Sequence, residues 1–410
     1  MSSPGTENVV IVGAGIIGVA TAYHLSLLSP TTTIHLVEAA PTLFHSASGK
    51  AAGFLARGWF APASAALGAL SFDLHRKLAA EHGGGKAWAY SPSTAYSISD
   101  AQAPESAERG EDWLFQGTSR ALMAGGGAQQ RSGAPEWLAV GRAGETSGVE
   151  KISDPSGTAQ VDPLLLSQFL LDQARSRGVQ LHHPATPTGV VTSPSNALTG
   201  LTIRTADGAE QTLPCDSLIL TAGVWTPRVF STLFPSSSTR LPITQLSGYS
   251  LVLRSPHWAE DPYTDDSPRT SHAAFTTDPA AGFSPEIFSR ASGDIYLAGL
   301  NTTDVPVADV GAHVVPEPRE IARLKDVAKK MLGTEQLDIL SEGLCHRPVM
   351  PTGMPLLTAL SEHQTGVVGK VWVSSGHGPW GISMSLGTGL VLAEMALGKA
   401  PSADVSQLCL

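Results

Sequence analysis

Cysteine and charge are both scarce in this chain of 410 residues, and each shortage excludes a class of protein. The three cysteines (Cys215, Cys345 and Cys409) are too few for a disulfide framework and suit a reducing compartment. Charged residues make up only 15% of the chain against 42% hydrophobic residues, which excludes a disordered protein. The net charge of −10 leaves no basic surplus for binding nucleic acid.

Long apolar runs and targeting signals are lacking as well. The first residues, MSSPGTEN, contain no basic segment followed by an apolar one, so we expect no signal peptide. The apolar stretch 9–22 is shorter than the ~20 residues of a membrane span and contains glycines. We therefore expect a cytoplasmic protein without a membrane span, of undetermined oligomeric state.

The opening of the chain has the pattern of a dinucleotide-binding unit. Residues 8–12 (NVVIV) predict a buried parallel strand, and a G-x-G-x-x-G turn and a helix follow it. In this turn Gly13 permits the bend, Gly15 lets a pyrophosphate approach, and Gly18 lets the helix pack closely. The alternative is a glycine-rich turn in an unrelated α/β fold.

A second predicted strand, at 34–37, ends at Glu38, 20 residues after Gly18. A carboxylate at this spacing accepts hydrogen bonds from a ribose hydroxyl. An acid here, rather than an arginine, argues against a 2′-phosphate on the ligand. The pattern alone does not separate NAD from FAD.

The rest of the chain alternates between strands and helices. Residues 46–53 (SASGKAAG) suit backbone lying against a flat ligand, or else form a flexible loop. Residues 101–135 predict an exposed excursion. Further predicted elements are a helix at 161–178, a hairpin around 207–208, strands at 217–220, 241–254, around 275 and at 286–300, a helix at 316–332, and a final strand, glycine loop and helix.

Five blocks, in order along the chain, resemble the FAD-dependent amino acid oxidase superfamily, which includes glycine oxidase, sarcosine oxidase and D-amino acid dehydrogenase. The blocks are VVIVGAGIIGVATAYHL with Glu38, SGKAAGFLA, AQVDPLLLSQFLLDQARSRGV, LILTAGVWTP, and GLCHRPVMPTGMPLL with SSGHGPWGISMSLGTG. The segments SGKAAGFLARGW and GHGPWGIS are most similar to a fungal-type subgroup.

This resemblance implies an α/β fold of two domains and FAD as the cofactor. A Rossmann-like FAD-binding domain would comprise residues 1–90, 151–240 and 341–410. A substrate domain with a mixed, antiparallel-rich sheet would comprise residues 91–150 and 241–340. The implied activity is oxidation of a C–N bond of an amino acid or secondary amine, with hydride transfer to flavin N5 and hydrolysis of the imine. The alternatives are an amine dehydrogenase with an acceptor other than oxygen, and a flavin-binding regulatory or trafficking protein without turnover.

The pattern and the resemblance together predict a set of cofactor-binding residues. These are Gly13, Gly15, Ile16, Ile17, Gly18, Glu38, Ala39, Ser46, Ser48, Gly49, Lys50, Ala51, Ala52, Gly53, Val190, Thr221, Ala222, Gly223, Trp225, Cys345, Arg347, Gly376, His377, Gly378, Pro379, Trp380, Gly381 and Ile382.

Four residues are candidates for catalysis: Arg347, His377, Trp380 and Lys50. The resemblance implies that Arg347 holds a substrate carboxylate, which a guanidinium binds with two hydrogen bonds; the alternative is a structural arginine. His377 and Trp380 belong to a loop beside the flavin ring, although His377 is equally typical of an ordinary loop. Lys50 would supply a positive charge near the flavin, or else be a solvated loop lysine.

Cys345 lies where sarcosine oxidase-like members carry the cysteine that bonds to the flavin 8α carbon, and its alternative is a buried free cysteine. Those members also carry an oxygen-activating lysine in a region that corresponds here to IYLAGLNTTD, which contains none. This absence weakens the case for an oxidase relative to a dehydrogenase, although the resemblance still favours the oxidase.

Aromatic residues and histidines complete the candidates. Trp59, Phe60 and Tyr249 would cage an amine, or simply belong to the core. His24, His35, His45, His75, His182 and His183 have no metal-ligand spacing, so we expect no metal.

Overall fold

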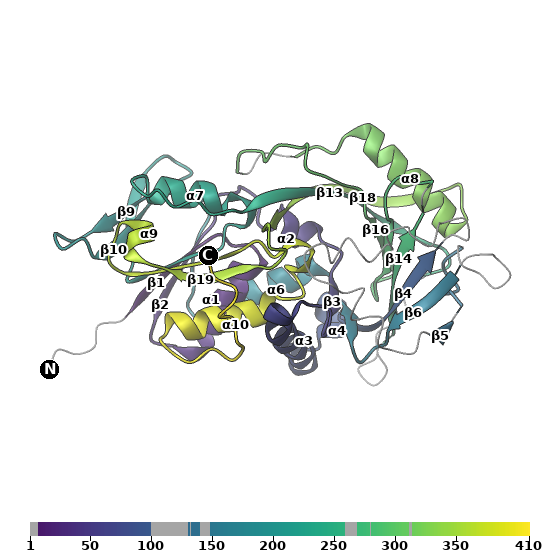
Figure 1. Cartoon of the computed structure of the whole chain (residues 1–410), viewed down its shortest axis with the longest axis horizontal. Helices are drawn as coiled ribbons and strands as arrows, with labels where there is room; N and C mark the ends of the chain where they lie inside the picture. The colour runs from purple at the N-terminus through teal and green to yellow at the C-terminus, as the bar shows by residue number, and fades with distance from the viewer. Residues whose placement is uncertain are drawn as a thin grey trace.

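The computed structural model describes residues 7–99, 130–131, 133–139, 148–258, 269–278, 280–310 and 314–410. Two sheets dominate it (Figure 1). A six-stranded sheet and its helices lie at the left of Figure 1, and a larger sheet lies at the right. Two long strands, β13 (Thr244–Arg254) and β18 (Asp338–Val349), run side by side along the top of the view.

The six-stranded sheet has the strand order β19-β20-β12-β1-β2-β8 and is parallel except for β19. Its strands are short apolar runs, which is typical of a sheet buried on both faces. Their bounds are β1 Asn8–Val12, β2 Thr33–Val37, β8 Gln180–His182, β12 Ser217–Leu220, β19 Leu356–Leu360 and β20 Lys370–Ser375.

Alternate residues of β1 belong to different cores. Val9 and Ile11 pack with helices on one face, whereas Val10 and Val12 pack toward a three-stranded sheet. The helices of the first face are α1 Ile16–Leu28, α3 Pro62–His82, α6 Pro163–Ser176 and α10 Ser385–Ala396. On the second face are β9 Ala185–Thr192, β10 Leu198–Thr205, β11 Glu210–Pro214 and α7 Thr226–Leu233.

The larger sheet is mixed and mostly antiparallel, with one parallel pair between β14 and β4. Its further strands are β4 Ser91–Ser99, β5 Gln130–Arg131, β6 Gly148–Ser153, β14 Ser271–Thr277, β15 Glu286–Ser289, β16 Asp294–Ala298 and β17 Asn301–Thr302, with β3 Phe54–Ala56 and β7 Thr158–Gln160 joined at its side. Helix α8 (Pro318–Leu332) packs on one face, and the other face turns toward the helices of the dinucleotide unit.

The structure differs from the sequence-based expectations in several places. The 46–53 segment contains a short helix, α2 (Ala47–Lys50), and the 286–300 segment is a hairpin of two strands. Helix α3 and strand β18 had no predicted counterpart. Strand β18 also crosses the predicted domain boundary at 341, and the domain boundaries stay predictions. Most of the 101–135 excursion lies outside the described residues.

The remaining short elements are α4 Gly84–Trp88, α9 Glu362–Thr365 and the 3₁₀ turns η2 Gly223–Trp225 and η3 Gly378–Trp380. Among the described residues, no helix has the length and apolarity needed to cross a membrane.

Candidate active site

The turn between β1 and α1 has the close packing that its glycines permit. Gly13 has a φ of +104°, and a Cβ there would lie 2.7 Å from the Thr221 carbonyl oxygen. A Cβ on Gly18 would overlap the carbonyl oxygen of Gly13. Both positions therefore require glycine, and the start of α1 is pressed against the end of β1.

Glu38 lies at the end of β2, beside this turn. Its carboxylate accepts a hydrogen bond from the Ala14 N–H at 2.8 Å and another from the Ala40 N–H at 2.8 Å. The acid predicted to bind a ribose is therefore fixed at the mouth of the glycine turn, where the resemblance requires it.

The strip 46–53 follows the same turn. The Ser48 hydroxyl accepts a hydrogen bond from the Ile16 N–H at 2.9 Å, at the first position of α1. Gly53 has a φ of +90°, and a Cβ there would overlap the Val161 carbonyl oxygen. The strip is thus bound at one end to the dinucleotide turn and at the other to the start of α6, rather than being a flexible loop.

A loop between β20 and α10 approaches from the carboxyl end of the chain. It comprises Gly376, which has a φ of +79°, and the turn η3 with the flanking residues His377 and Gly381. The His377 ring is buried, and its Nε2 lies 3.2 Å from the Thr388 hydroxyl. Burial lowers the pKa of His377 to about 4, so the ring is neutral near pH 7 and does not act there as a cationic acid.

These three segments line one open cavity, whose empty space, including the solvent at its mouth, is about 1950 Å³. The predicted residues on its wall are Gly13, Gly15, Ile16, Ile17, Glu38, Ala39, Ser46, Ser48, Lys50, Ala51, Ala52, Gly53, Thr221, Ala222, Gly223, Trp225, Cys345, Arg347, His377, Gly378, Pro379, Trp380, Gly381 and Ile382. The amino-terminal turn and the carboxy-terminal loop, more than 350 residues apart, therefore border one space, as a dinucleotide with a ring system at its far end requires.

Four predicted cofactor residues do not line this cavity. Gly18 and Gly49 serve backbone packing, against Gly13 and Phe44 respectively. A Cβ on Gly376 would overlap the Met350 side chain. Val190 packs against the core beneath the three-stranded sheet.

Arg347 projects from β18 onto the cavity wall. Its Nη1 donates a 2.6 Å hydrogen bond to Asn301 Oδ1, and its guanidinium lies against the backbone of Gly248 on β13. A guanidinium has five N–H donors in a planar fork, so the bond to Asn301 and a bidentate bond to a carboxylate are compatible.

Lys50 and Cys345 lie near Arg347. Lys50 Nζ donates to the Leu344 carbonyl oxygen at 3.2 Å, and burial lowers the pKa of the lysine. Burial raises the pKa of the Cys345 thiol, while the charges of Arg347 and Lys50 oppose that rise. Lys50 is thus half-buried at the site rather than solvated.

An aromatic wall was not foreseen from the sequence. Phe275, Phe288 and Tyr296 line the cavity from three neighbouring strands, with Glu286 between them. The period-two pattern of Glu286, Ile287 and Phe288 was the available signal, because alternate residues of a strand share a face. Phe54 and Trp380 complete this wall, with ring centroids 6.4 Å apart.

Trp59, Phe60 and Tyr249 belong to the core, the second of the two alternatives that the sequence offered, and do not line the cavity. Trp59 and Phe60 are buried behind Trp380, with centroid distances of 6.3 Å and 4.9 Å. Tyr249 faces the core beneath α8, on the opposite side of the sheet. In the described part of the chain, no group of three or more His, Cys, Asp or Glu side chains is arranged to hold a metal ion.

Comparison with known proteins agrees with this geometry. The family described as FAD dependent oxidoreductase matches residues 8–395. A Schizosaccharomyces pombe protein, whose name assigns it provisionally to the oxidoreductases, is 26% identical over 98% of this chain and 97% of its own length. D-amino acid dehydrogenase 2 of Pseudomonas aeruginosa is 26% identical over 51% of this chain and 43% of that protein.

Two solved structures share the fold over nearly the full chain. Glycine oxidase from Geobacillus kaustophilus has a TM-score of 0.71, with 20% identity and 99% of both chains covered. L-proline dehydrogenase from P. horikoshii also has a TM-score of 0.71, with 14% identity, covering 99% of this chain and 97% of the other. These likenesses confirm the predicted fold of a parallel dinucleotide-binding sheet joined to a mixed, mostly antiparallel one.

Proposed function

This chain belongs to the family of FAD-dependent oxidoreductases, and from that premise we propose that it oxidises a C–N bond of an amino acid or a secondary amine that carries a carboxylate. The observation that carries the proposal is Arg347 on the cavity wall, oriented by Asn301. Hydrolysis of the resulting imine releases a carbonyl compound and an amine or ammonia.

The residues present fit FAD. Glu38 and the glycine turn would hold the adenosine and pyrophosphate end, and the loop 376–382 would hold the ring end. When bound, FAD supplies the acceptor for the two electrons that leave the carbon beside the nitrogen. The protein itself has to orient the substrate and exclude water.

Orientation falls to Arg347. A bidentate contact fixes the direction of a carboxylate as well as its position, which a point charge does not. Phe275, Phe288 and Tyr296 form the apolar side of the same cavity. An apolar wall strengthens the ionic contact by lowering the local dielectric.

The electron acceptor divides the proposal into two versions. Residues 295–304 contain no lysine, and Asn301 in this run is bonded to Arg347, which supports a dehydrogenase. The half-buried Lys50 on the cavity wall supports an oxidase, since it brings positive charge to the site. We propose the oxidase, with the dehydrogenase as the second candidate.

One anaerobic titration tests all of this. The purified protein is mixed with a panel of amino acids and secondary amines, the flavin absorbance is followed, and air is then admitted. Bleaching followed by fast recovery in air supports the oxidase, and bleaching with slow recovery supports the dehydrogenase. No bleaching by any member of the panel would contradict the enzymatic proposal and favour a binding role.

A further inference from the structure

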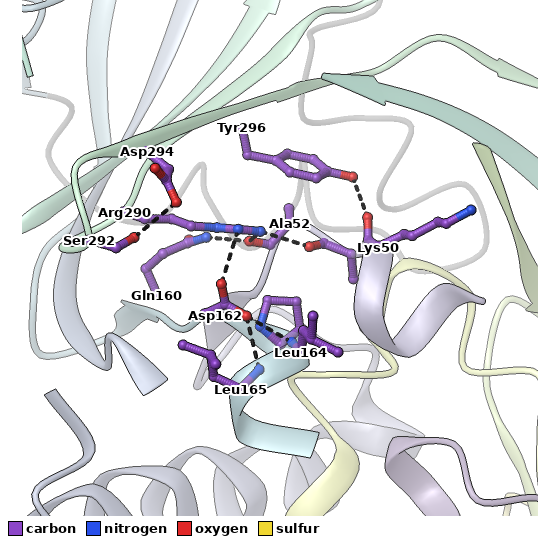
Figure 2. Close-up of polar contacts among 12 residues, drawn as sticks. Lys50, Ala52, Gln160, Asp162, Leu164, Leu165, Arg290, Ser292, Asp294 and Tyr296 are labelled. Carbon is purple, nitrogen blue, oxygen red and sulfur yellow. Dashed lines mark hydrogen bonds and ion pairs between the residues drawn. The ribbon is translucent and has the colours of Figure 1, made fainter. Parts of the chain in front are cut away.

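Three consecutive backbone carbonyls of the strip 46–53 are held by side chains from other elements (Figure 2). The Lys50 carbonyl oxygen accepts a hydrogen bond from the Tyr296 hydroxyl at 2.9 Å. The Ala51 and Ala52 carbonyl oxygens accept bonds from Arg290 Nη2 at 3.0 Å and 3.1 Å. Lys50 is the last residue of α2, and a helix end leaves its final carbonyls without partners inside the helix.

Arg290 comes from the other sheet. It opens the turn between β15 and β16, where its N–H donates to the Asp294 carbonyl oxygen at 2.8 Å. Its side chain is only 7% exposed, and its guanidinium carbon lies 5.3 Å from the centre of the Tyr296 ring. Arg290 therefore brings a buried positive charge from the larger sheet to the strip 46–53.

Asp162 and Gln160 complete this arrangement, which we call the Arg290 clamp: Arg290, Tyr296, Gln160 and Asp162. One carboxylate oxygen of Asp162 accepts hydrogen bonds from the backbone N–H groups at the start of α6. The other carboxylate oxygen lies 3.5 Å from Arg290 Nη1. Gln160 Nε2 donates to the Ala52 carbonyl oxygen at 2.6 Å. Figure 2 shows Arg290, Tyr296 and Gln160 converging on one short stretch of backbone, with Asp162 beneath Arg290.

The opposite side of that stretch forms the cavity wall. Lys50, Ala51 and Ala52 line the cavity, whereas Arg290, Gln160 and Asp162 do not. Arg290, Gln160 and Asp162 therefore stand behind the strip, seen from the cofactor cavity, whereas Tyr296 also lines the cavity. Gln160 and Arg290 reach the strip from segments more than 100 residues away.

We propose that Arg290 is a positioning residue for the FAD site: it fixes the carbonyls of Ala51 and Ala52 and thereby holds the strip in the position that accepts the cofactor. The inference rests on FAD binding by this family and not on the identity of the substrate. A guanidinium suits the role because one rigid fork reaches two carbonyls and a carboxylate together. Without it, the strip would have to be ordered by the cofactor, at the expense of affinity.

The test measures FAD affinity directly. All proteins carry Cys345→Ser, so that a covalent bond cannot mask the equilibrium, and each apoprotein is titrated with FAD while flavin fluorescence is followed. Removing Arg290 alone leaves the half-buried carboxylate of Asp162 without its cation, which endangers folding. The central comparison is therefore Asp162→Asn against Arg290→Met with Asp162→Asn, because asparagine still caps α6.

The matched control is Arg254→Met. Arg254 also faces the β15–β16 hairpin, through a 3.9 Å ion pair with Asp294, but its side chain is 62% exposed. We expect Arg254→Met to keep the Kd for FAD within about twofold, because its ion pair is exposed. Asp162→Asn is the baseline for the double variant, which we expect to raise the Kd roughly tenfold or more above that baseline. We expect the Kd of Arg290→Lys to lie between those of the parent and the double variant.

The second readout is the melting temperature with and without FAD. A positioning role predicts that loss of Arg290 lowers the melting temperature of the FAD-bound form more than that of the apoprotein, because the cofactor binds the folded state less tightly. Equal losses in both forms, or an unchanged Kd in a folded double variant, would overturn the proposal. So would a parent protein that binds no FAD, whereas failure of the amine panel would leave this inference intact.

Discussion

The guanidinium of Arg347 lies on the backbone of Gly248, so closely that a Cβ at residue 248 would overlap Nη1. The two residues belong to neighbouring antiparallel strands, where Gly248 is paired with Cys345. The missing side chain on β13 is therefore what lets Arg347 extend along the sheet to Asn301, 2.6 Å away.

This contact makes Gly248→Ala a test of the proposed carboxylate site. The methyl group would displace the guanidinium without requiring an unusual backbone, since the φ of Gly248 is not positive. We expect KM for a carboxylate substrate to rise about tenfold, with a smaller change in kcat. Gly189→Ala on β9, where a Cβ meets nothing within 4 Å, is the control, and equal KM values in the two variants would contradict the prediction.

Replacing Arg347 itself separates charge from geometry. Arg347→Lys keeps the positive charge but loses the planar fork, and Arg347→Ala loses both. We expect KM for a carboxylate substrate to rise about tenfold in the lysine variant and about a hundredfold in the alanine variant. Steady-state kinetics with an amine lacking the carboxylate supplies the comparison, because its KM should not change. An unaltered KM for the carboxylate substrate would remove Arg347 from the site.

Cys345 lies on the cavity wall, where burial raises the pKa of its thiol and the charges of Arg347 and Lys50 oppose that rise. We expect the purified protein to retain its yellow colour in the pellet after acid precipitation, and Cys345→Ser to release the colour. Colour that stays in the supernatant for the unmodified protein would show that no covalent bond forms. Cys215, which is buried away from the cavity, provides the matched serine variant.

The buried His377 predicts a pH dependence of stability. Burial lowers its pKa to about 4 from 6.5, so between these values the unfolded chain binds a proton that the folded site does not. The free energy of unfolding should fall as the pH drops below about 6.5, by up to about 1.4 kcal/mol per pH unit for this group.

Chemical denaturation near neutral pH and at about pH 5 measures this loss. His377→Gln, which can still bond to Thr388, should lose less stability between the two conditions than the parent protein. His257→Gln alters an exposed histidine and serves as the control. A His377→Gln variant with the same acid loss as the parent would refute the assignment.

The dinucleotide unit was predictable because each of its signals is local. The strand, the glycine turn, the helix and Glu38 lie within 31 residues, and Gly13 and Gly18 are required by contacts inside that unit or with the adjoining strand end. The resemblance predicted Arg347 and the cavity-wall residues of the loop 376–382. No rule of sequence spacing links these residues to Gly13.

Only the tertiary structure decided which side chains form hydrogen bonds to the strip 46–53. Arg290 and Ala51 are 239 residues apart, and Tyr296 and Lys50 are 246 apart, so no sequence pattern pairs them. The sequence also left undecided on which face of the sheet a strand residue places its side chain, because a register shift of one position moves that side chain to the other face. Register therefore placed Tyr249 in the core beneath α8 and Phe288 on the cavity wall, although both are aromatic residues of strands in the same sheet. The sequence determined the cofactor-binding turn, since short-range sterics fix it, and the folded sheets determined which side chains face the reaction.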